Sequence, residues 1–191
     1  MKKILLLALM ITSLNYAQEK VSEPAKRVLE QKNTISVGLI ASEPFTINLT
    51  YERKKNNQSL FFNSNQSRII SIGNGGLSVT NGFKTVDGYG LVVSLGTRTY
   101  YKKESWSGFY SDSKTEYGSI KFSDGDYSGT YSYLSIINLD FGYKWQVSKG
   151  FSIDPAIGLL WKLEIKGTGN VDNKLFDNFV PKFGLKMGYS F

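Results

Sequence analysis

Phe179-Val-Pro-Lys-Phe-Gly-Leu-Lys-Met-Gly-Tyr-Ser-Phe191, the carboxy-terminal stretch, alternates between two kinds of side chain. Every odd position except Pro181 is apolar or aromatic, and from Lys182 onward every even position is Lys, Gly or Ser. A period of two residues places each set on its own face of a β-strand. About 9 to 11 residues of tilted strand cross a bilayer, and this stretch is long enough. It therefore predicts the last strand of a transmembrane β-barrel.

The same alternation recurs upstream and predicts an all-β fold, an eight-stranded antiparallel up-and-down transmembrane β-barrel. The expected strands run from Thr34 to a turn at Glu43-Pro44, and then over Phe45–Glu52, Ser59–Ile72, Asp87–Tyr101, Trp106–Ile120, Gly129–Gln146, Phe151–Leu163 and Phe179–Phe191. Polar runs at Ser64–Arg68 and Ser111–Thr115 interrupt the third and fifth strands, so the register of these two stays open.

The connections are expected to alternate in length. Short turns are predicted at Arg53–Asn57, Lys102–Glu104 and Val147–Gly150, and long loops at Gly73–Thr85, Lys121–Ser128 and Lys166–Asn178. Short periplasmic turns, longer outer loops and an even strand number are typical of outer-membrane barrels, with both chain ends in the periplasm. Proline cannot donate to a strand ladder, so Pro155 and Pro181 are predicted to mark β-bulges.

Aromatic residues near the predicted strand ends are expected to form girdles at the two membrane surfaces. They are Tyr51, Tyr100, Tyr101, Tyr131, Tyr133, Tyr143, Trp145, Trp161, Tyr189 and Phe191. The alternative is a soluble lipocalin-like barrel, secreted or periplasmic, whose apolar faces point inward around an apolar ligand. The frequent glycines on the small face favour the membrane barrel, because a solvated surface would carry more polar side chains.

Composition and the amino terminus bound the possible functions. The chain has 191 residues, 41% of them hydrophobic and 20% charged, with a formal charge of +7, which is the size of one domain. It has neither Cys nor His, which removes disulfides, the commonest general base and the usual transition-metal ligands. Lys2 and Lys3, a short apolar run and a small-residue site predict a cleaved signal peptide over residues 1–17.

The polar residues 18–33 predict a periplasmic leader ahead of a barrel over residues 34–191. A plug inside the barrel or a partner-binding peptide is the alternative for this leader. Its few apolar side chains favour the plain leader, because they give it little to bury.

Three motifs resemble small OmpA/OmpX-like outer-membrane barrels. They are Asn138-Leu-Asp-Phe-Gly-Tyr-Lys-Trp145, Gly150-Phe-Ser-Ile-Asp-Pro-Ala-Ile-Gly158 and Gly184-Leu-Lys-Met-Gly-Tyr-Ser-Phe191. The chain is most similar to a family of such barrels that is still a domain of unknown function. The resemblance implies that Met187, Tyr189 and Phe191 form the insertion signal read by the barrel-assembly machinery. It implies no agreed activity.

Polar side chains on the inner face are predicted to form a network in the lumen. They are Glu52, Arg98, Asp140, Lys144, Asp154, Lys162, Lys182 and Lys186. An eight-stranded barrel is just wide enough for side chains to fill it, and buried opposite charges are expected to pair. A closed lumen follows from such packing, and a narrow gated pore is the alternative.

No catalytic, cofactor-binding or metal site is predicted. Asp140 and Asp154 on neighbouring strands are candidates for paired acid/base carboxylates, but lysines neighbour both. The loop aspartates at Asp124–Asp126, Asp172 and Asp177 match no calcium-loop spacing. Gly73–Gly76 lacks the Lys-Ser/Thr of a phosphate-binding loop.

The sequence therefore predicts a non-enzymatic protein of the Gram-negative outer membrane, with a structural or surface-interaction role through its outer loops. Its expected partners are outer-membrane lipid and lipopolysaccharide, with no nucleic acid, and a monomer is expected. A lipid-modifying barrel enzyme remains a further alternative.

Overall fold

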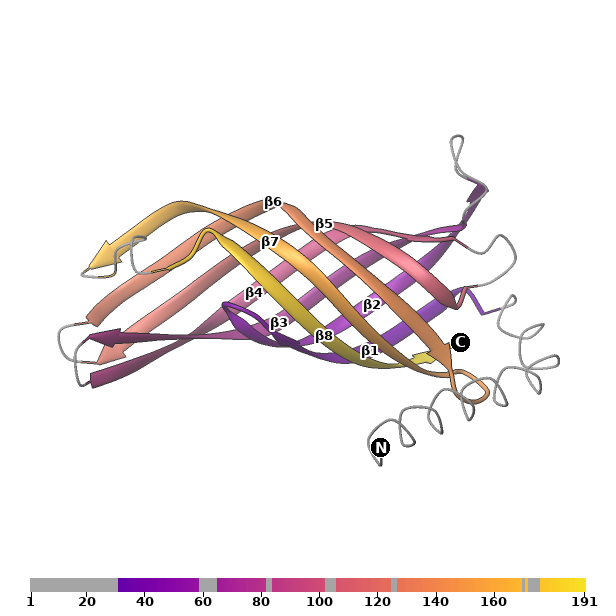
Figure 1. Ribbon diagram of the computed structural model, residues 1–191, viewed down its shortest axis with the longest axis horizontal. Helices are drawn as coiled ribbons and strands as arrows, with labels where there is room; N and C mark the ends of the chain where they lie inside the picture. Colours follow the sequence, from indigo (N-terminus) through magenta and orange to yellow (C-terminus); the bar gives the residue numbers. More distant parts are fainter. Residues whose placement is uncertain are drawn as a thin grey trace, which may run out of the picture.

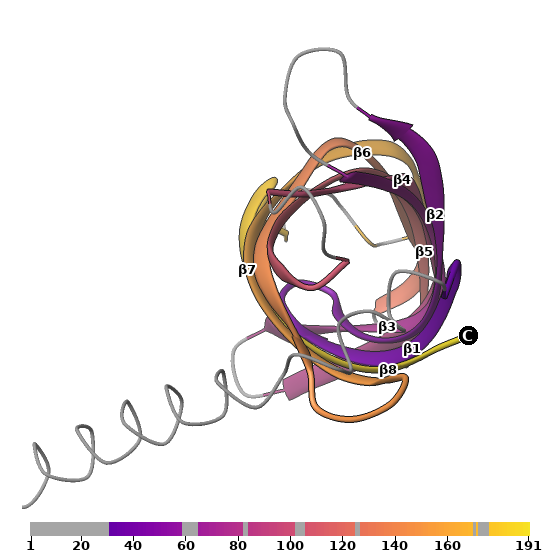
Figure 2. The same cartoon turned by 90° about the vertical axis from the view of Figure 1, so that its right-hand side faces the viewer.

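Eight antiparallel strands form one closed barrel in a computed structural model that describes residues 31–58, 65–81, 84–101, 106–124, 127–169, 171 and 176–191 (Figure 1). The strands are β1 (Asn33–Ala41), β2 (Phe45–Gln58), β3 (Asn65–Asn81), β4 (Lys84–Tyr100), β5 (Gly108–Asp124), β6 (Tyr127–Gln146), β7 (Phe151–Gly169) and β8 (Phe179–Ser190). Each strand pairs with the next, and β8 pairs with β1, so the predicted fold class is confirmed (Figure 2). The predicted signal peptide, and all but the last three residues of the predicted leader, lie outside the described residues. The described residues contain no helix that is long and apolar enough to cross a membrane.

The carboxy-terminal strand closes the barrel. Its partners on β1 run from Thr34↔Ser190 to Ala41↔Phe183, and the backbones of Asn33 and Phe191 bond to each other in both directions at 3.0 and 2.9 Å. The start of β1 and the carboxy terminus therefore lie side by side at one end of the barrel, here called the terminal end. The opposite end, which holds the β3–β4 and β5–β6 hairpins and the β7–β8 connection, is called the loop end.

The strands differ in how far they reach toward the loop end. The β1–β2 hairpin turns at Ser42–Pro44, and β3 pairs with β2 only as far as Gly76. Beyond that point Leu77–Asn81 continue β3 and pair only with β4. Figure 1 shows the resulting shape, with β3 to β7 extending well past the short first hairpin.

The predicted loop at Gly73–Thr85 is wrong, because most of these residues belong to β3 and β4. The polarity of the two strand faces inverts near the loop end: apolar Leu77 and Val79 are buried inside, whereas polar Ser78 and Thr80 are exposed outside. Alternation persists, but its apolar phase faces the interior, as in a water-soluble barrel. Because the outward residues of this part of β3 are polar, a prediction based on apolar outward residues places the end of the strand too early.

The predicted alternation of connection lengths is also wrong. Arg53–Asn57 belong to β2, whereas two residues separate β3 from β4 and two separate β5 from β6. Strand pairing takes up most of the predicted outer loops, including much of Lys121–Ser128 and the start of Lys166–Asn178. The turns at Glu43-Pro44 and Val147–Gly150 are confirmed. The predicted turn at Lys102–Glu104 lies outside the described residues.

A β-bulge in β6 reverses which side chains face inward. The register shifts between Leu134 and Ile137, where β6 carries one more residue than β7 opposite it, and Ile136 and Ile137 are both exposed. Before this bulge Tyr131 and Tyr133 point into the lumen, so their assignment to a membrane girdle is wrong. After it the inward phase passes to the even-numbered residues.

Two further assignments change. Tyr100 is fully buried, because it shares its strand face with Arg98, and so it belongs to no girdle. The register between β7 and β8 is continuous through Pro155 and Pro181, so neither proline marks a bulge there. Each proline instead takes an exposed outward position, opposite Leu185 and Leu159 respectively.

Candidate functional site

The outer surface of the barrel is an apolar belt. Its exposed members on the first two and the last three strands, and at the chain end, are Ile35, Val37, Leu39, Phe45, Ile47, Leu49, Tyr51, Ile136, Ile137, Leu139, Phe141, Trp145, Phe151, Ile157, Leu159, Trp161, Leu163, Ile165, Phe179, Phe183, Leu185, Met187, Tyr189 and Phe191. The predicted girdle residues Tyr51, Tyr101, Trp145, Trp161 and Tyr189 are among the exposed aromatic side chains. The belt is weakest on β5, where Ser111, Ser113 and Thr115 take the outward positions.

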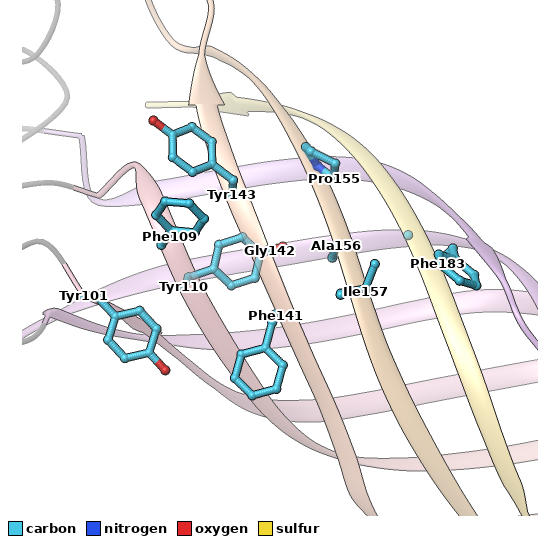
Figure 3. Close-up of a pocket in the computed structure, with 11 residues that line it drawn as sticks. Tyr101, Phe109, Tyr110, Phe141, Gly142, Tyr143, Pro155, Ala156, Ile157 and Phe183 are labelled. Atoms are coloured by element: carbon cyan, nitrogen blue, oxygen red, sulfur yellow. The ribbon is translucent and has the colours of Figure 1, made fainter. Parts of the chain in front are cut away.

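A shallow apolar groove of about 540 Å³ crosses this belt near the terminal end. Figure 3 shows the rings of Phe109, Tyr143 and Phe141 beside it, on β5 and β6. The floor is formed by small residues, Gly142 and Ala156 among them, and Phe109 meets Tyr143 edge to face at 4.8 Å. Tyr110, which also contacts the lumen network described next, is among the residues that line the groove.

Arg98 is the centre of the charged network inside the terminal half of the lumen. Its guanidinium donates to both carboxylate oxygens of Asp112, at 2.7 and 2.9 Å, and to Asp154 at 2.7 Å. The guanidinium carbon also lies 3.6 Å from the ring centroid of Tyr110, whose hydroxyl donates to Asp154. Bidentate pairing of this kind is among the strongest that proteins form, and both partners here are buried.

Glu52 joins this network from β2. Its carboxylate accepts from Lys144 at 2.9 Å, from Ser67 at 2.7 Å and from Tyr100 at 2.8 Å, and Arg98 lies 3.7 Å away. Side chains from three other strands, β3, β4 and β6, thus converge on this acid and satisfy its lone pairs in the absence of bulk water.

A second cluster is built around Asp140. This carboxylate pairs with Lys114 and, at 2.5 Å, with Lys182. Lys182 also donates to Asn138, whose amide nitrogen in turn donates to Glu116 at 2.9 Å. The chain of contacts ties β5, β6 and β8 together across the lumen.

All eight residues predicted for the lumen network lie buried inside the barrel. The structure brings Glu52, Arg98, Lys144 and Asp154 into one cluster and Asp140 with Lys182 into another. Lys186 is buried beside Gly38 and takes part in none of the ion pairs among the described residues. Lys162 lies apart, toward the loop end. Met187, Tyr189 and Phe191 all project outward from the barrel.

Sequence reasoning missed the partners that β5 supplies. Asp112, Lys114 and Glu116 fall in or next to the polar run at Ser111–Thr115, where neither strand face is apolar. Their even numbering, in step with buried Tyr110, was the available signal. Lys54, predicted to lie in a turn, is also buried, with its ammonium 5.2 Å from the Trp106 ring centroid.

The interior of the loop end is mostly apolar. A cluster of buried residues fills it: Leu77, Val79, Val86, Val92, Ile120, Phe122, Tyr131, Tyr133, Val171 and Phe176. Val171 and Phe176 come from the connection between β7 and β8, and they complete the cluster beside the strands. We call this interior, together with Lys162, the upper chamber.

The candidate catalytic pair is not formed. Asp140 and Asp154 belong to two different clusters, and each is occupied by cationic partners. Among the described residues no three acidic side chains lie together in a group that could hold a metal ion. The side chains of Asp124, Asp126 and Asp172, whose spacing matches no calcium loop, lie outside the described part of the structure.

Comparison with known proteins gives weak matches only. No family model matches the chain, and no curated protein matches it. The chain is similar to Ail, the attachment invasion locus protein of Yersinia pestis, in complex with the heparin analogue sucrose octasulfate, at 18% identity and a TM-score of 0.47, covering 84% of this chain and 97% of that one. The backbone structure of Yersinia pestis Ail in a phospholipid bilayer nanodisc matches at 20% identity and a TM-score of 0.47, covering 84% and 99%. Matches this weak transfer neither function nor ligand.

Proposed function

We propose that the protein is a non-enzymatic integral β-barrel of the Gram-negative outer membrane. The observation that carries the proposal is the apolar belt, in which large side chains such as Val37, Ile157 and Phe183 are more than half exposed. A soluble monomer rarely exposes a continuous apolar surface larger than a few hundred Å². A closed barrel also satisfies the backbone hydrogen bonds that a lipid environment leaves without water.

The belt also weighs against the soluble-carrier alternative. In a carrier with an oily interior, positions such as Leu49 and Leu185 would point inward and the charged residues outward. Here Leu49 and Leu185 are exposed, while Arg98 and Lys144 are buried.

The proposed orientation places the terminal end in the periplasm and the loop end outside the cell. The outer surface of the loop end supports it, since Ser78, Thr80, Asp87, Lys121 and Ser123 replace the apolar belt there. Lipid and lipopolysaccharide are the partners that this surface and the belt would meet. Outward-facing Met187, Tyr189 and Phe191 are proposed as the signal for the insertion machinery.

The charged network is proposed to close the lumen rather than to line a pore. Ion pairs span the interior of the terminal half from several strands, and aromatic and aliphatic side chains fill the loop end. With side chains at both levels of the interior, no open path for ions is expected through the barrel. The β3–β4 and β5–β6 hairpins, which reach beyond the belt, are proposed as the part that meets external partners.

Site-directed spin labelling tests the placement in the membrane, because the chain has no cysteine and a single introduced thiol is labelled cleanly. Labels at Ile47→Cys and Leu185→Cys in lipid vesicles are expected to be relaxed by oxygen and shielded from a water-soluble relaxation agent. A label at Ser123→Cys should show the opposite preference. Equal access of the water-soluble agent to all three positions would refute the proposal.

A further inference from the structure

The upper chamber contains a buried cation without a partner. Lys162 is fully buried, and within the described residues its ammonium has no hydrogen-bond acceptor. Glu43, Glu116 and Asp177 act on it electrostatically, yet none forms an ion pair with it within 4 Å. A buried charge is costly unless it is paired and hydrogen-bonded.

Aromatic rings surround this ammonium. The ring centroids of Tyr131, Tyr133 and Phe176 lie 5.6, 5.8 and 5.9 Å from Lys162 Nζ. The Tyr131 hydroxyl is itself buried and, among the described atoms, has no hydrogen-bond partner. Two polar groups that lack partners, one of them cationic, thus belong to neighbouring side chains inside an apolar chamber.

The charge balance of the lumen points in the same direction. Among the described side chains, the buried charged residues comprise seven cations and five carboxylates: Lys54, Arg98, Lys114, Lys144, Lys162, Lys182 and Lys186 against Glu52, Asp112, Glu116, Asp140 and Asp154. Most of the carboxylates are taken up by the clusters at the terminal end. The upper chamber can therefore accept an anion without excess negative charge.

Phe176 fills the space where an apolar ligand would lie. Its ring centroid lies 4.4 Å from that of Tyr131 and 5.9 Å from that of Phe122. The residue lies between β7 and β8 and belongs to neither strand. Leu77–Asn81 of β3 pair with β4 on one side, and β2 does not reach them on the other side. Phe176 belongs to no strand, so a shift of its ring breaks no strand pairing.

We propose that the upper chamber binds a medium-chain carboxylate, an apolar chain with one acidic head. Lys162 and Tyr131 would hold the carboxylate, and the alkyl chain would take the place of the Phe176 ring between Tyr131 and Phe122. A carboxylate carries the single charge that one ammonium balances, whereas a phosphate monoester would leave a second buried charge unpaired.

The test is isothermal titration calorimetry of the full barrel in dodecyl maltoside micelles with sodium octanoate, octanol and octyl phosphate. Titrations into protein-free micelles are subtracted. Octanoate is expected to bind saturably and more tightly than either other probe. Lys162→Met should weaken octanoate binding by about tenfold or more, since hydrogen bonds to a charged group are lost. Phe176→Ala should strengthen it, and the exposed-turn control Lys149→Met should leave it unchanged.

Unchanged octanoate affinity in Lys162→Met would overturn the site. The absence of saturable binding in both the native chain and Phe176→Ala would also overturn it. The Lys162 ammonium would then have buried water, and not a carboxylate, as its hydrogen-bond partner. If Lys162→Met does not fold, Tyr131→Phe decides, because it removes only an unpartnered hydroxyl: weaker binding supports the site and unchanged binding overturns it. Tighter binding of octyl phosphate would overturn the choice of headgroup.

Discussion

Replacing Arg98 with methionine tests the energetic weight of the lumen network. Methionine fills much of the same volume but leaves Asp112 with no ion-pair partner among the described residues, and it removes the cation that faces Asp154 and Glu52. Breaking a buried pair by removing one partner costs about 3–5 kcal/mol, because the other charge stays buried. Asp154 keeps Tyr110 and Glu52 keeps Lys144, so most of the cost is assigned to Asp112.

The assay is urea unfolding of the barrel in lipid vesicles, followed by the gel mobility of the folded form. Arg98→Met is expected to lower the free energy of unfolding by about 3–5 kcal/mol, whereas the exposed control Arg68→Met should change it by less than about 0.5 kcal/mol. The double variant Arg98→Met/Asp112→Leu should recover part of the loss, since the orphaned carboxylate is gone. A loss below about 1 kcal/mol in the single variant, or no recovery in the double, would refute the reasoning.

Three further outcomes are expected. Gly118→Ala should lower the free energy of unfolding by about 1–3 kcal/mol, because its methyl group would overlap the Tyr133 ring, while Gly184→Ala, with its nearest atom 3.8 Å away, should be neutral in the same urea titration. Ile47→Arg should cost about 2–4 kcal/mol in lipid and Ser123→Arg about 0–1, since only the first puts a charge in the apolar belt; equal costs would contradict this placement of the belt. The native barrel should show no steady ohmic conductance in planar bilayers, and reproducible open channels would contradict a closed lumen.

Strand periodicity was enough to predict the barrel, because the signal on β1, β2 and β8 is strong. In these strands every outward residue must tolerate lipid and every inward one must fit a narrow lumen, as at Val37, Ile47 and Leu185. The same constraint identified Arg98 and Lys144 as inward-facing. These two residues are predictable because a single phase runs through β4 and through the part of β6 that follows its bulge.

Elsewhere the sequence admits more than one phase. At the β6 bulge Ile136 and Ile137 are both apolar, so an unbroken alternation through Tyr131 and Tyr133 is as consistent with the sequence as the true one. Beyond the belt the apolar residues of β3 face inward and the polar ones outward, so the extension of β3 was not predicted. The ion-pair partners on β5 were not predicted, because hydroxyl residues face outward there and neither strand face is apolar.

The pairing of charges depends on the register between strands, which alternation alone does not determine. Arg98 meets Asp112 because the two residues are direct partners on β4 and β5. It meets Asp154 only because the barrel closes and brings β7 across the lumen from β4. The sequence alone could assign these residues to the interior but not to their partners.

The most direct test of the membrane-barrel account is the gel mobility of the native protein in carbonate-washed outer-membrane fractions, with and without boiling. The account predicts that the protein stays with the membranes, runs as a compact band unboiled and migrates more slowly after boiling. Recovery of the folded protein in the soluble periplasmic or secreted fraction would contradict the account.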